Sequence, residues 1–374
     1  MIGAREAAMT LEAALRDLRS EKPRVRAGAA DALAGLREAS PAEELAVYQA
    51  LLRATRDDEA PVRYSAVCTL VELEMRDAVR RLFELCDDAD SLVGQAAIAG
   101  LGELGVAEAF EPLALFLRTA SAPLRFQAAL SIAQIDASRA APLLIDALSD
   151  RDPEVQANAA AALGDCARAG VLEDALRALA CVRLTGLLEA APPDLRLEAA
   201  LALAWLGDRR ATAPLCDVLA DAGRGVAAAE ALARLRDPAA LPALRRVRGR
   251  FWAPRVARVA ASAALARLGE GDGEREFLLD RARRGPADAR GLAIAALGEA
   301  RVPGAREVLE GILARRRDDQ AAAAAAALGA LGDPSARAAL EQARAAHADP
   351  EVRDEAARVL ARLAPPPDSE AGAR

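Results

Sequence analysis

The chain has 374 residues and a formal net charge of −7, and 53% of its residues are hydrophobic but only 3% are aromatic. Nucleic-acid binding needs a basic surface that displaces counterions, so this charge disfavours a nucleic-acid partner. A core with so few aromatic residues must be built from alanine and leucine, which suits packed helices better than a sheet.

The opening residues 1–20 lack the apolar stretch of a secretory signal, and no run approaches the ~18 consecutive apolar residues of a spanning helix. We therefore expect a cytoplasmic protein without a membrane partner. The cysteines fall singly, at Cys68, Cys86, Cys166, Cys181 and Cys216, with no C-x-x-C pair. This spacing favours reduced, buried thiols over a disulfide framework or a metal site.

One short phrase recurs along the whole chain, and each copy carries a Leu or Ile that serves as its anchor. The 11 anchors are Leu33, Leu70, Leu101, Ile132, Leu163, Leu203, Leu232, Leu265, Leu297, Leu328 and Leu360. By subtraction, the steps between them run from 29 to 40 residues, and most are 31 to 33. Such a period is typical of stacked repeats, so we predict a single solenoid over residues 1–364 and a disordered tail over 365–374.

In chain order, "TLEAALRDLR" at 10–19 predicts a starting helix, and the 37-residue first step predicts a long helix in 37–55. A typical unit follows in "DPEVQANAAAALGD" at 152–165. Asp152 can cap a helix whose first turn holds Pro153, and Val155, Ala159, Leu163 and Cys166 form a helical stripe. We interpret this stripe as the second helix of a unit.

Gly and Asp after the stripe, as at 206–208 and 331–333, predict the end of the second helix. A shorter apolar segment, as at 109–118 or 212–220, then predicts the first helix of the next unit. The 40-residue step lengthens the helix predicted in 171–190; we expect a harmless extension, with a functional ledge as the alternative. The seven alanines Ala321–Ala327 predict a spacer where neighbouring helices approach closely.

The phrases at 152–165 and "DPEVRDEAARVLARL" at 349–363 resemble the D-P-x-V-R-x-x-A-A-x-A-L-G pattern of HEAT-like repeats, in particular the short type named after phycobilin lyases. A unit near 31 residues is shorter than the ~40–47 of long HEAT and armadillo units. The resemblance implies an all-α, right-handed α-solenoid of 11 HEAT-like helical hairpins. It implies an architecture and no particular activity.

In this repeat class the second helices line the concave surface, so positions 2, 3, 6 and 10 after the stripe start are expected to face a partner. The tenth position is acidic or polar early, aromatic at Trp205 and mostly basic later. The net charge follows the same trend, from −9 over residues 1–187 to +2 over 188–374. The candidate partner-binding residues are Tyr64, Glu72, Gln95, Glu103, Phe126, Gln127, Gln134, Asn158, Asp165, Glu198, Trp205, Arg234 and Arg267.

Three aromatic residues among these candidates, Tyr64, Phe126 and Trp205, are plausible anchors because aromatic side chains dominate interface energetics. The alternative places Phe126 and Trp205 in the core. Trp252, in "RGRFWAPRV" at 248–256, is predicted to pack between units, with base stacking beside its arginines as the alternative.

Catalytic patterns are weak. The HEAT-like di-iron hydroxylases use repeated His-Glu pairs, whereas this chain has one histidine, His347, which we expect to face solvent. HEAT-like DNA glycosylases hold DNA in a basic groove, whereas the early concave column here is acidic. Neither a G-x-x-x-x-G-K loop nor a G-x-S-x-G elbow is present.

The favoured hypothesis is therefore a non-catalytic scaffold that binds a protein or peptide on its concave face and needs no cofactor or metal. Two alternatives stay open. One is a subunit similar to phycobilin lyases that acts on a tetrapyrrole-carrying protein, and the other is a DNA-binding HEAT-like protein.

Overall fold

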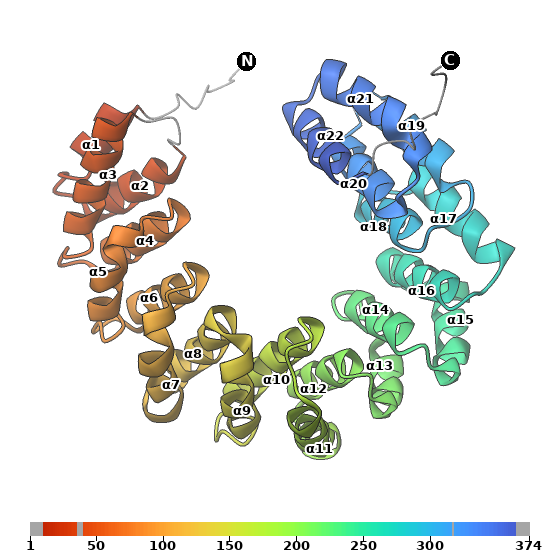
Figure 1. Cartoon of the computed structure of the whole chain (residues 1–374), viewed down its shortest axis with the longest axis horizontal. Coiled ribbons are helices and arrows are strands. Elements are labelled where there is room, and N and C mark those ends of the chain that lie inside the picture. The colour runs from red at the N-terminus through yellow and green to blue at the C-terminus, as the bar shows by residue number, and fades with distance from the viewer. Residues whose placement is uncertain (1–9, 36–39, 316–317, 364–374) are drawn as a thin grey trace, which may run out of the picture. The chain divides into compact units, whose positions relative to one another are not determined.

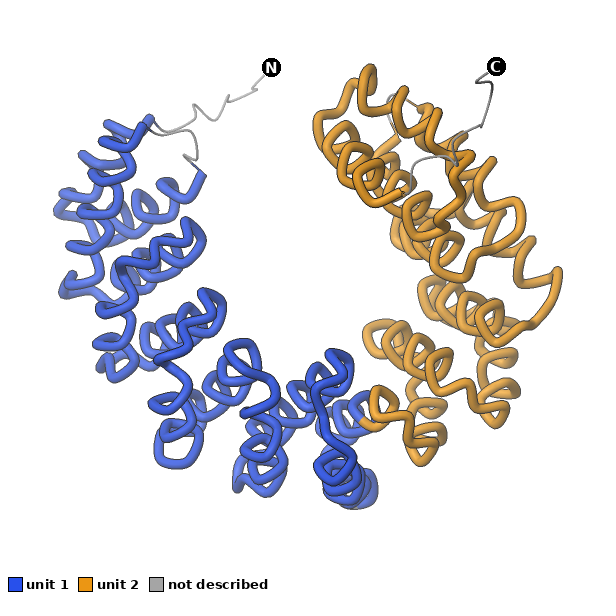
Figure 2. The backbone as a smooth tube through the Cα atoms, in the orientation of Figure 1, with its two compact units in different colours: residues 1–202 blue, residues 203–374 orange. Residues whose placement is uncertain are grey.

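The computed structural model describes residues 10–35, 40–315 and 318–363. Those ranges hold 22 α-helices and no strand (Figure 1). The chain divides into two compact units, Met1–Ala202 and Leu203–Arg374 (Figure 2). Each unit is a stack of helix hairpins, which confirms the predicted all-α solenoid. The predicted tail at 365–374 lies outside the described residues.

Unit 1 contains the first six hairpins, each made of a first helix and the second helix that follows it. The first helices are α1 (Leu11–Asp17), α3 (Pro41–Ala54), α5 (Val79–Leu85), α7 (Phe110–Thr119), α9 (Ala137–Ala147) and α11 (Asp174–Ala190). The second helices are α2 (Pro23–Ala34), α4 (Ala60–Glu72), α6 (Ser91–Glu103), α8 (Ala122–Ile135), α10 (Pro153–Arg168) and α12 (Pro193–Trp205), which ends in unit 2. Two 3₁₀ helices, η1 (Arg76–Ala78) and η2 (Ala107–Ala109), lead into α5 and α7.

Unit 2 repeats the arrangement. Its first helices are α13 (Thr212–Val218), α15 (Leu241–Gly249), α17 (Asp272–Arg284), α19 (Ala305–Leu313) and α21 (Arg337–Ala346). Its second helices are α14 (Gly225–Leu235), α16 (Arg255–Arg267), α18 (Ala287–Glu299), α20 (Ala321–Leu331) and α22 (Pro350–Arg362). The 3₁₀ helices η3 (Arg209–Ala211), η4 (Pro238–Ala240) and η5 (Pro334–Ala336) precede α13, α15 and α21.

The helix ends follow the predicted signals. The Asp152 side chain accepts a hydrogen bond from the Glu154 backbone N–H at 2.9 Å, and Pro153 opens α10. At the other end of a hairpin, Gly332 has a φ of 71°, a left-handed conformation that suits glycine and stops α20. Capping and stop residues therefore set the hairpin boundaries, as predicted.

The core runs along each unit as a row of anchors. All the anchors that define the repeat, from Leu33 to Leu360, are buried. Second helices pack on the second helices of the next hairpin, as α2 does on α4 and α18 on α20. Because burying a leucine is worth about 1.5–3 kcal/mol, each hairpin depends on its neighbours for stability.

The alanine run has the spacer role expected of it. Ala321–Ala327 begin α20, and a Cβ atom added to Gly298 of α18 would lie 2.4 Å from the Ala327 carbonyl oxygen. On the other side of α20, a Cβ on Gly329 would meet the Val359 side chain of α22 at 2.9 Å. Only small side chains permit backbones to approach so closely.

In seven of the 11 repeats an arginine stands one residue after the stripe start, and this column of arginines joins the hairpins. The arginine side chain donates a hydrogen bond to a backbone carbonyl of the turn that precedes its own helix. Arg63, for example, donates to the Asp57 carbonyl at 2.8 Å. The same contact is made by Arg26, Arg125, Arg196 and Arg353. Arg258 and Arg290 instead donate to the carbonyls of Arg248 and Ala282, in the last turns of α15 and α17.

Four of these arginines also bind an aspartate in the next hairpin's turn, and we call each such pair an arginine clamp. The clamps are Arg26–Asp57, Arg63–Asp88, Arg125–Asp150 and Arg290–Asp318, with two hydrogen bonds each at 2.6–2.9 Å. Burial alone would raise the pKa of each aspartate. The arginine and a backbone N–H two residues later lower the pKa below its ordinary value instead.

Two sequence expectations are corrected here. His347 does not face solvent: it is buried at the end of α21, where its Nδ1 accepts a hydrogen bond from the Asp349 N–H at 3.1 Å. His347 lines a hollow together with Leu313 of α19 and with Ala343 and Ala346 of α21. Of the cysteines, only Cys86 and Cys166 are buried, while Cys68, Cys181 and Cys216 are half-buried near the helix surface.

The longer helix predicted in 171–190 exists as α11, which has 17 residues. Leu179 and Val182 of this helix are exposed. Among the described residues, no helix is long and apolar enough to cross a membrane.

Candidate partner-binding face

We call the surface formed by the second helices of one unit the second-helix face of that unit. Helices α4, α6, α8 and α10 lie along one side of unit 1 (Figure 1). Unit 1 carries Tyr64, Glu72, Gln95, Glu103, Phe126, Gln127, Gln134, Asn158, Asp165 and Glu198 on these helices and on α12. Unit 2 carries Trp205, Arg234 and Arg267 on α12, α14 and α16.

In unit 1 the tenth position of the repeat is the most accessible. Glu72, Glu103, Gln134 and Asp165 are all exposed, and each stands at or near the end of its helix. Tyr64 is also exposed, at 43%. The remaining candidates of unit 1 are half-buried, namely Gln95, Phe126, Gln127, Asn158 and Glu198.

The surroundings of Tyr64 are negatively charged. Cys68 lies one turn further along α4, and it is the largest cause of the raised pKa of Tyr64, with Asp31 adding to it. The pKa of the Cys68 thiol is raised by burial and then by the charges of Asp31 and Glu103. Two carboxylates from α2 and α6 thus act on one point of α4, and their field attracts cationic groups.

The amide side chains of the face are engaged within the protein. Asn158 Nδ2 donates to the Phe126 carbonyl oxygen at 2.9 Å, which joins α10 to α8. Gln95 Nε2 donates to the Ser91 carbonyl at 3.1 Å, within its own helix. The column pattern did not indicate the bracing role of Asn158, because a polar residue in a column looks the same whether it contacts a partner or a neighbouring helix.

Two candidates occupy intermediate environments. Glu198 is half-buried, and burial followed by the charge of Asp194 raises its pKa. Phe126 is half-buried as well, so it is neither a core residue nor a fully presented anchor. Its edge and the exposed ring of Tyr64 are the aromatic contributions of unit 1 to the face.

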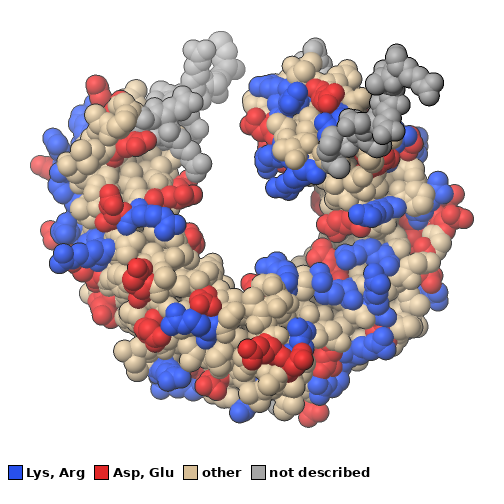
Figure 3. Space-filling view, in the orientation of Figure 1, with Lys and Arg blue, Asp and Glu red and all other residues tan. Residues whose placement is uncertain are grey.

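The second-helix face of unit 2 is internally paired. The Arg234 guanidinium lies 3.5 Å from the centre of the half-buried Trp205 ring, a cation–π contact. Arg267 Nη1 lies 3.8 Å from Glu299 Oε2. A hollow of about 60 Å³ beside this pair is lined mainly by alanines, with Glu230 at its rim. In Figure 3 the Lys and Arg side chains gather over α14 and α16.

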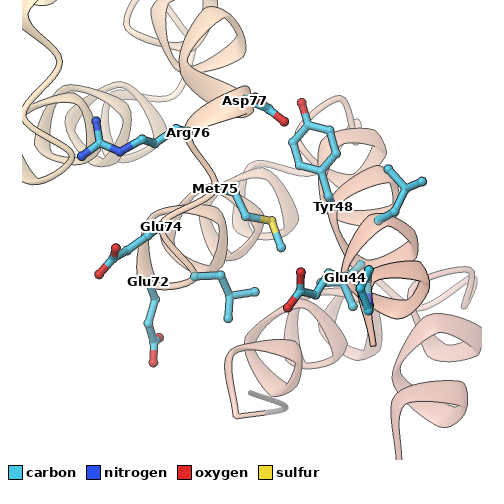
Figure 4. A pocket seen from close by; sticks show the side chains of 11 residues that line it. Glu44, Tyr48, Glu72, Glu74, Met75, Arg76 and Asp77 are labelled. Atoms are coloured by element: carbon cyan, nitrogen blue, oxygen red, sulfur yellow. The ribbon is translucent and has the colours of Figure 1, made fainter. Parts of the chain in front are cut away.

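A larger hollow, of about 730 Å³, lies between α3 and the segment that follows α4. Tyr48 and Met75 project into it and Glu44 lies at its rim, while Arg76 points away (Figure 4). Glu72 belongs both to this hollow and to the second-helix face. The sequence pattern does not indicate this hollow, although the 37-residue step predicts the longer helix, α3, that forms one of its walls.

A metal site finds no support in the ranges that the structure describes. They hold no group of three or more His, Cys, Asp or Glu side chains that could bind a metal ion. The residues of the second-helix face offer carboxylates, amides, arginines and aromatic rings, which are groups for recognition.

The family follows from the repeat pattern. The family model described as "HEAT repeats" matches residues 48–130, 110–184 and 275–361. The chain is a HEAT-repeat protein. Within this HEAT-repeat protein, residues 195–221 and 226–247 match the "PBS lyase HEAT-like repeat", so the predicted resemblance to both repeat types is confirmed.

Solved structures similar to the HEAT-repeat protein include the following three, each at low sequence identity. The complex of CpcE and CpcF of phycocyanin lyase from Nostoc sp. PCC7120 shares 22% identity, covering 66% of this chain and 96% of that chain, with a TM-score of 0.42. Importin beta shares 14% identity over 94% of this chain and 57% of that chain, with a TM-score of 0.49. Human deoxyhypusine hydroxylase shares 22% identity over 70% and 98%, with a TM-score of 0.32.

No curated protein matches the sequence of the HEAT-repeat protein. The family and the geometry of the second-helix face therefore carry the functional proposal.

Proposed function

We propose that this HEAT-repeat protein is a non-catalytic scaffold, and that the second-helix face of unit 1 binds a protein or peptide segment rich in lysine or arginine. The observation that carries the proposal is the exposed acidic row of Glu72, Glu103 and Asp165 beside the exposed ring of Tyr64. Solenoids use the extended surfaces of stacked repeats for binding, so the row lies where a partner is expected.

The spacing of the carboxylates supports an extended, basic partner. Glu72 and Glu103 end α4 and α6 in successive hairpins, and Asp165 follows two hairpins later on α10, beyond the neutral Gln134 of α8. Asp165 also pairs with Arg168 Nη2 of its own helix at 2.8 Å. Asp31 adds a further exposed carboxylate on α2. A chain with cationic side chains at intervals can contact several of them at once, and complementary charge then sets register and specificity.

The aromatic residues supply the apolar part of the contact. Tyr64 is exposed beside the acidic groups, and the half-buried Phe126 lies two hairpins further along the same face. Aromatic side chains are enriched among residues that dominate binding energy, and a lysine or arginine stem can pack on such a ring. Trp205, already covered by Arg234, is a weaker candidate than the sequence suggested.

The experiment compares two charge reversals of equal size. One variant combines Glu72→Lys, Glu103→Lys and Asp165→Lys on the second-helix face. The control combines Asp87→Lys, Glu108→Lys and Asp146→Lys, three exposed carboxylates on turns and first helices. Proteins are captured from an extract of the source organism and quantified by mass spectrometry, and an oligolysine peptide serves as a defined competitor.

Wild type and control are expected to capture the same protein, and the face variant is expected to lose at least about tenfold in affinity for it. Oligolysine should compete for the wild type and not for the face variant. Equal capture by all three proteins would remove the acidic row from the binding site.

A second candidate function is supported by the PBS lyase HEAT-like repeats at 195–221 and 226–247. In that case the protein would act on a tetrapyrrole-carrying protein, as a phycobilin lyase subunit does. An absorbance spectrum of the purified, captured complex separates the two candidates. A visible tetrapyrrole band would favour the lyase-like role, and its absence with a basic protein bound would favour the scaffold.

A further inference from the structure

Two neighbouring aromatic side chains project from the turn between α15 and α16 of unit 2. Phe251 is 85% exposed and Trp252 is 65% exposed. The prediction that Trp252 packs between neighbouring repeat hairpins is therefore wrong. The turn 250–254 carries both rings outward instead of into the α15–α16 contact, where small side chains such as Ala253 are buried.

Apart from Tyr64, the other described aromatic rings of this protein are buried or half-buried. Arg139 lies 3.9 Å from the centre of the buried Phe110 ring, and Arg248 lies 4.3 Å from that of the half-buried Phe277. Arg250 lies 4.9 Å from the Trp252 centre and leaves most of that ring accessible to water. A chain that is 3% aromatic thus exposes two adjacent rings at one turn. Exposed apolar groups of this size indicate a contact surface.

The rings are bordered by positive charge. Arg250 precedes them and Arg255 follows them, and neither has an acidic partner among the described ion pairs. Nearby arginines on α15 are neutralised, since Arg245 Nη2 lies 2.7 Å from Glu270 and Arg248 Nε lies 3.0 Å from Glu274. The net charge next to the rings is therefore positive.

The next hairpin extends this positive edge. Helices α16 and α18 pack side by side, and both begin after the turn of their hairpin, so the two turns lie on the same edge of unit 2. The turn before α18 follows two exposed arginines, Arg283 and Arg284, at the end of α17. One edge therefore combines two projecting rings with four arginines and one exposed aspartate, Asp288, in the first turn of α18.

The exposure of the rings favours a soft, flat partner over a nucleic-acid strand. Single-stranded nucleic acid is held in a groove that follows its backbone, whose walls cover the stacking rings. A ring that is 85% exposed has no such walls. An anionic bilayer needs none, because aromatic side chains insert among its headgroups while arginines bind the lipid phosphates.

We propose that the Phe251–Trp252 turn attaches the protein to the surface of an anionic lipid bilayer. The rings would enter the interface, and Arg250, Arg255, Arg283 and Arg284 would contact the headgroups. Apolar insertion plus basic residues is the pair of signals that peripheral attachment requires. The net charge of −7 does not prevent this contact, because fields from the rest of the protein are screened within about 8 Å at physiological salt. The inference is independent of the second-helix face.

The test is co-flotation of the full chain with vesicles of phosphatidylcholine alone, or of phosphatidylcholine with an equal amount of phosphatidylglycerol. The turn variant combines Phe251→Ser and Trp252→Ser. The matched control combines Leu92→Ser and Leu115→Ser, which remove side chains 63% and 62% exposed in unit 1. Wild type and control should float with the phosphatidylglycerol vesicles, and the turn variant at least about tenfold less. Melting curves should coincide, because all four side chains are exposed.

A second variant, Arg250→Gln with Arg255→Gln, keeps the rings and removes two charges. Its preference for the phosphatidylglycerol vesicles should be smaller than that of the wild type, because two of the four arginines remain, and wild-type binding should fall as salt is added. The tryptophan fluorescence of the wild type should shift to shorter wavelength on binding phosphatidylglycerol vesicles, and that of the turn variant, which keeps only Trp205, should not.

Failure of the wild type to float with either vesicle would overturn the proposal, as would flotation of the turn variant at the wild-type level. A fluorescence shift with single-stranded DNA at lower concentration than with vesicles would overturn it in favour of base stacking.

Discussion

Charged residues at the start and at the end of a second helix have different roles. At the start of α4, Arg63 is half-buried and holds Asp88 of the next turn at 2.6 Å. At the end of the same helix, Glu72 is exposed on the surface that we propose to bind a partner. The start of the helix faces the turn of the next hairpin, and the end does not. Nine residues along one helix therefore separate a charge that holds the stack together from a charge presented to solvent.

The largest expected effect comes from breaking a clamp. Arg125→Ala should lower the free energy of unfolding by about 3–5 kcal/mol, because it leaves Asp150, whose side chain is only 12% exposed, without its cation. Urea denaturation followed by circular dichroism measures the loss. Hydrogen exchange should place it in α8 to α10, since solenoid hairpins contact only their neighbours.

The matched control is Arg196→Ala, which removes a column arginine that contacts only the Ala191 carbonyl of its own turn, at 3.1 Å. Its expected cost is about 1 kcal/mol, the contribution of an ordinary hydrogen bond. Equal losses in the two variants would show that the clamp aspartate adds nothing.

Acid should weaken the clamped hairpins in particular. The folded-state pKa values of Asp57, Asp88, Asp150 and Asp318 are lowered, so their stabilisation is complete above the ordinary aspartate pKa of about 3.9 and is lost as pH falls below it. The free energy of unfolding, measured between neutral pH and pH 3, should decline most steeply below that value. Asp150→Asn should start lower and decline less; an identical slope would contradict the assignment.

Close backbone contact also makes the ends of some second helices sensitive to any added side-chain volume. Gly298→Ala should cost about 1–3 kcal/mol, because the new Cβ would lie 2.4 Å from the Ala327 carbonyl oxygen. Gly311→Ala on α19 meets nothing within 4 Å and should stabilise by about 0.5–1 kcal/mol through helix propensity. Thermal melts of the two variants should therefore move in opposite directions, and a shared direction would rule out the steric explanation.

The smallest change in the free energy of unfolding is expected from substitutions at the exposed ends of the second helices. The variant with Glu72→Lys, Glu103→Lys and Asp165→Lys should change the free energy of unfolding by no more than about 0.5 kcal/mol per site, as surface substitutions usually do. The same urea titration measures it. A loss as large as that of Arg125→Ala would mean that the acidic row stabilises the fold and is not primarily a binding surface.

The repeat phrase was sufficient to predict the fold. Eleven anchors at a near-constant spacing specify stacked hairpins, and local signals such as Asp152 and Gly332 specify where the helices begin and end. Even the alanine run could be interpreted, because a segment with high helix propensity and small side chains has a clear packing consequence. These predictions depend on contacts within one hairpin or between neighbouring hairpins of similar sequence.

The candidate site was less predictable, because a column of polar residues does not reveal what lies opposite. Asn158 was expected to meet a partner, and it braces α10 against α8. The arginine column was visible in the sequence, but its aspartates lie 25 to 31 residues away in the next turn. The exposure of Trp252 depends on how one turn is packed, which the residue types around it do not determine.

The clamp also bears on how such a chain lengthens. The α3–α4 hairpin carries both halves of the contact, since its turn supplies Asp57 for Arg26 and its second helix supplies Arg63 for Asp88. A tandem duplication of this hairpin therefore brings a matching donor and acceptor to both new junctions. Gene duplication can add hairpins of this kind without any compensating substitution, and the length of the array is open to evolutionary change.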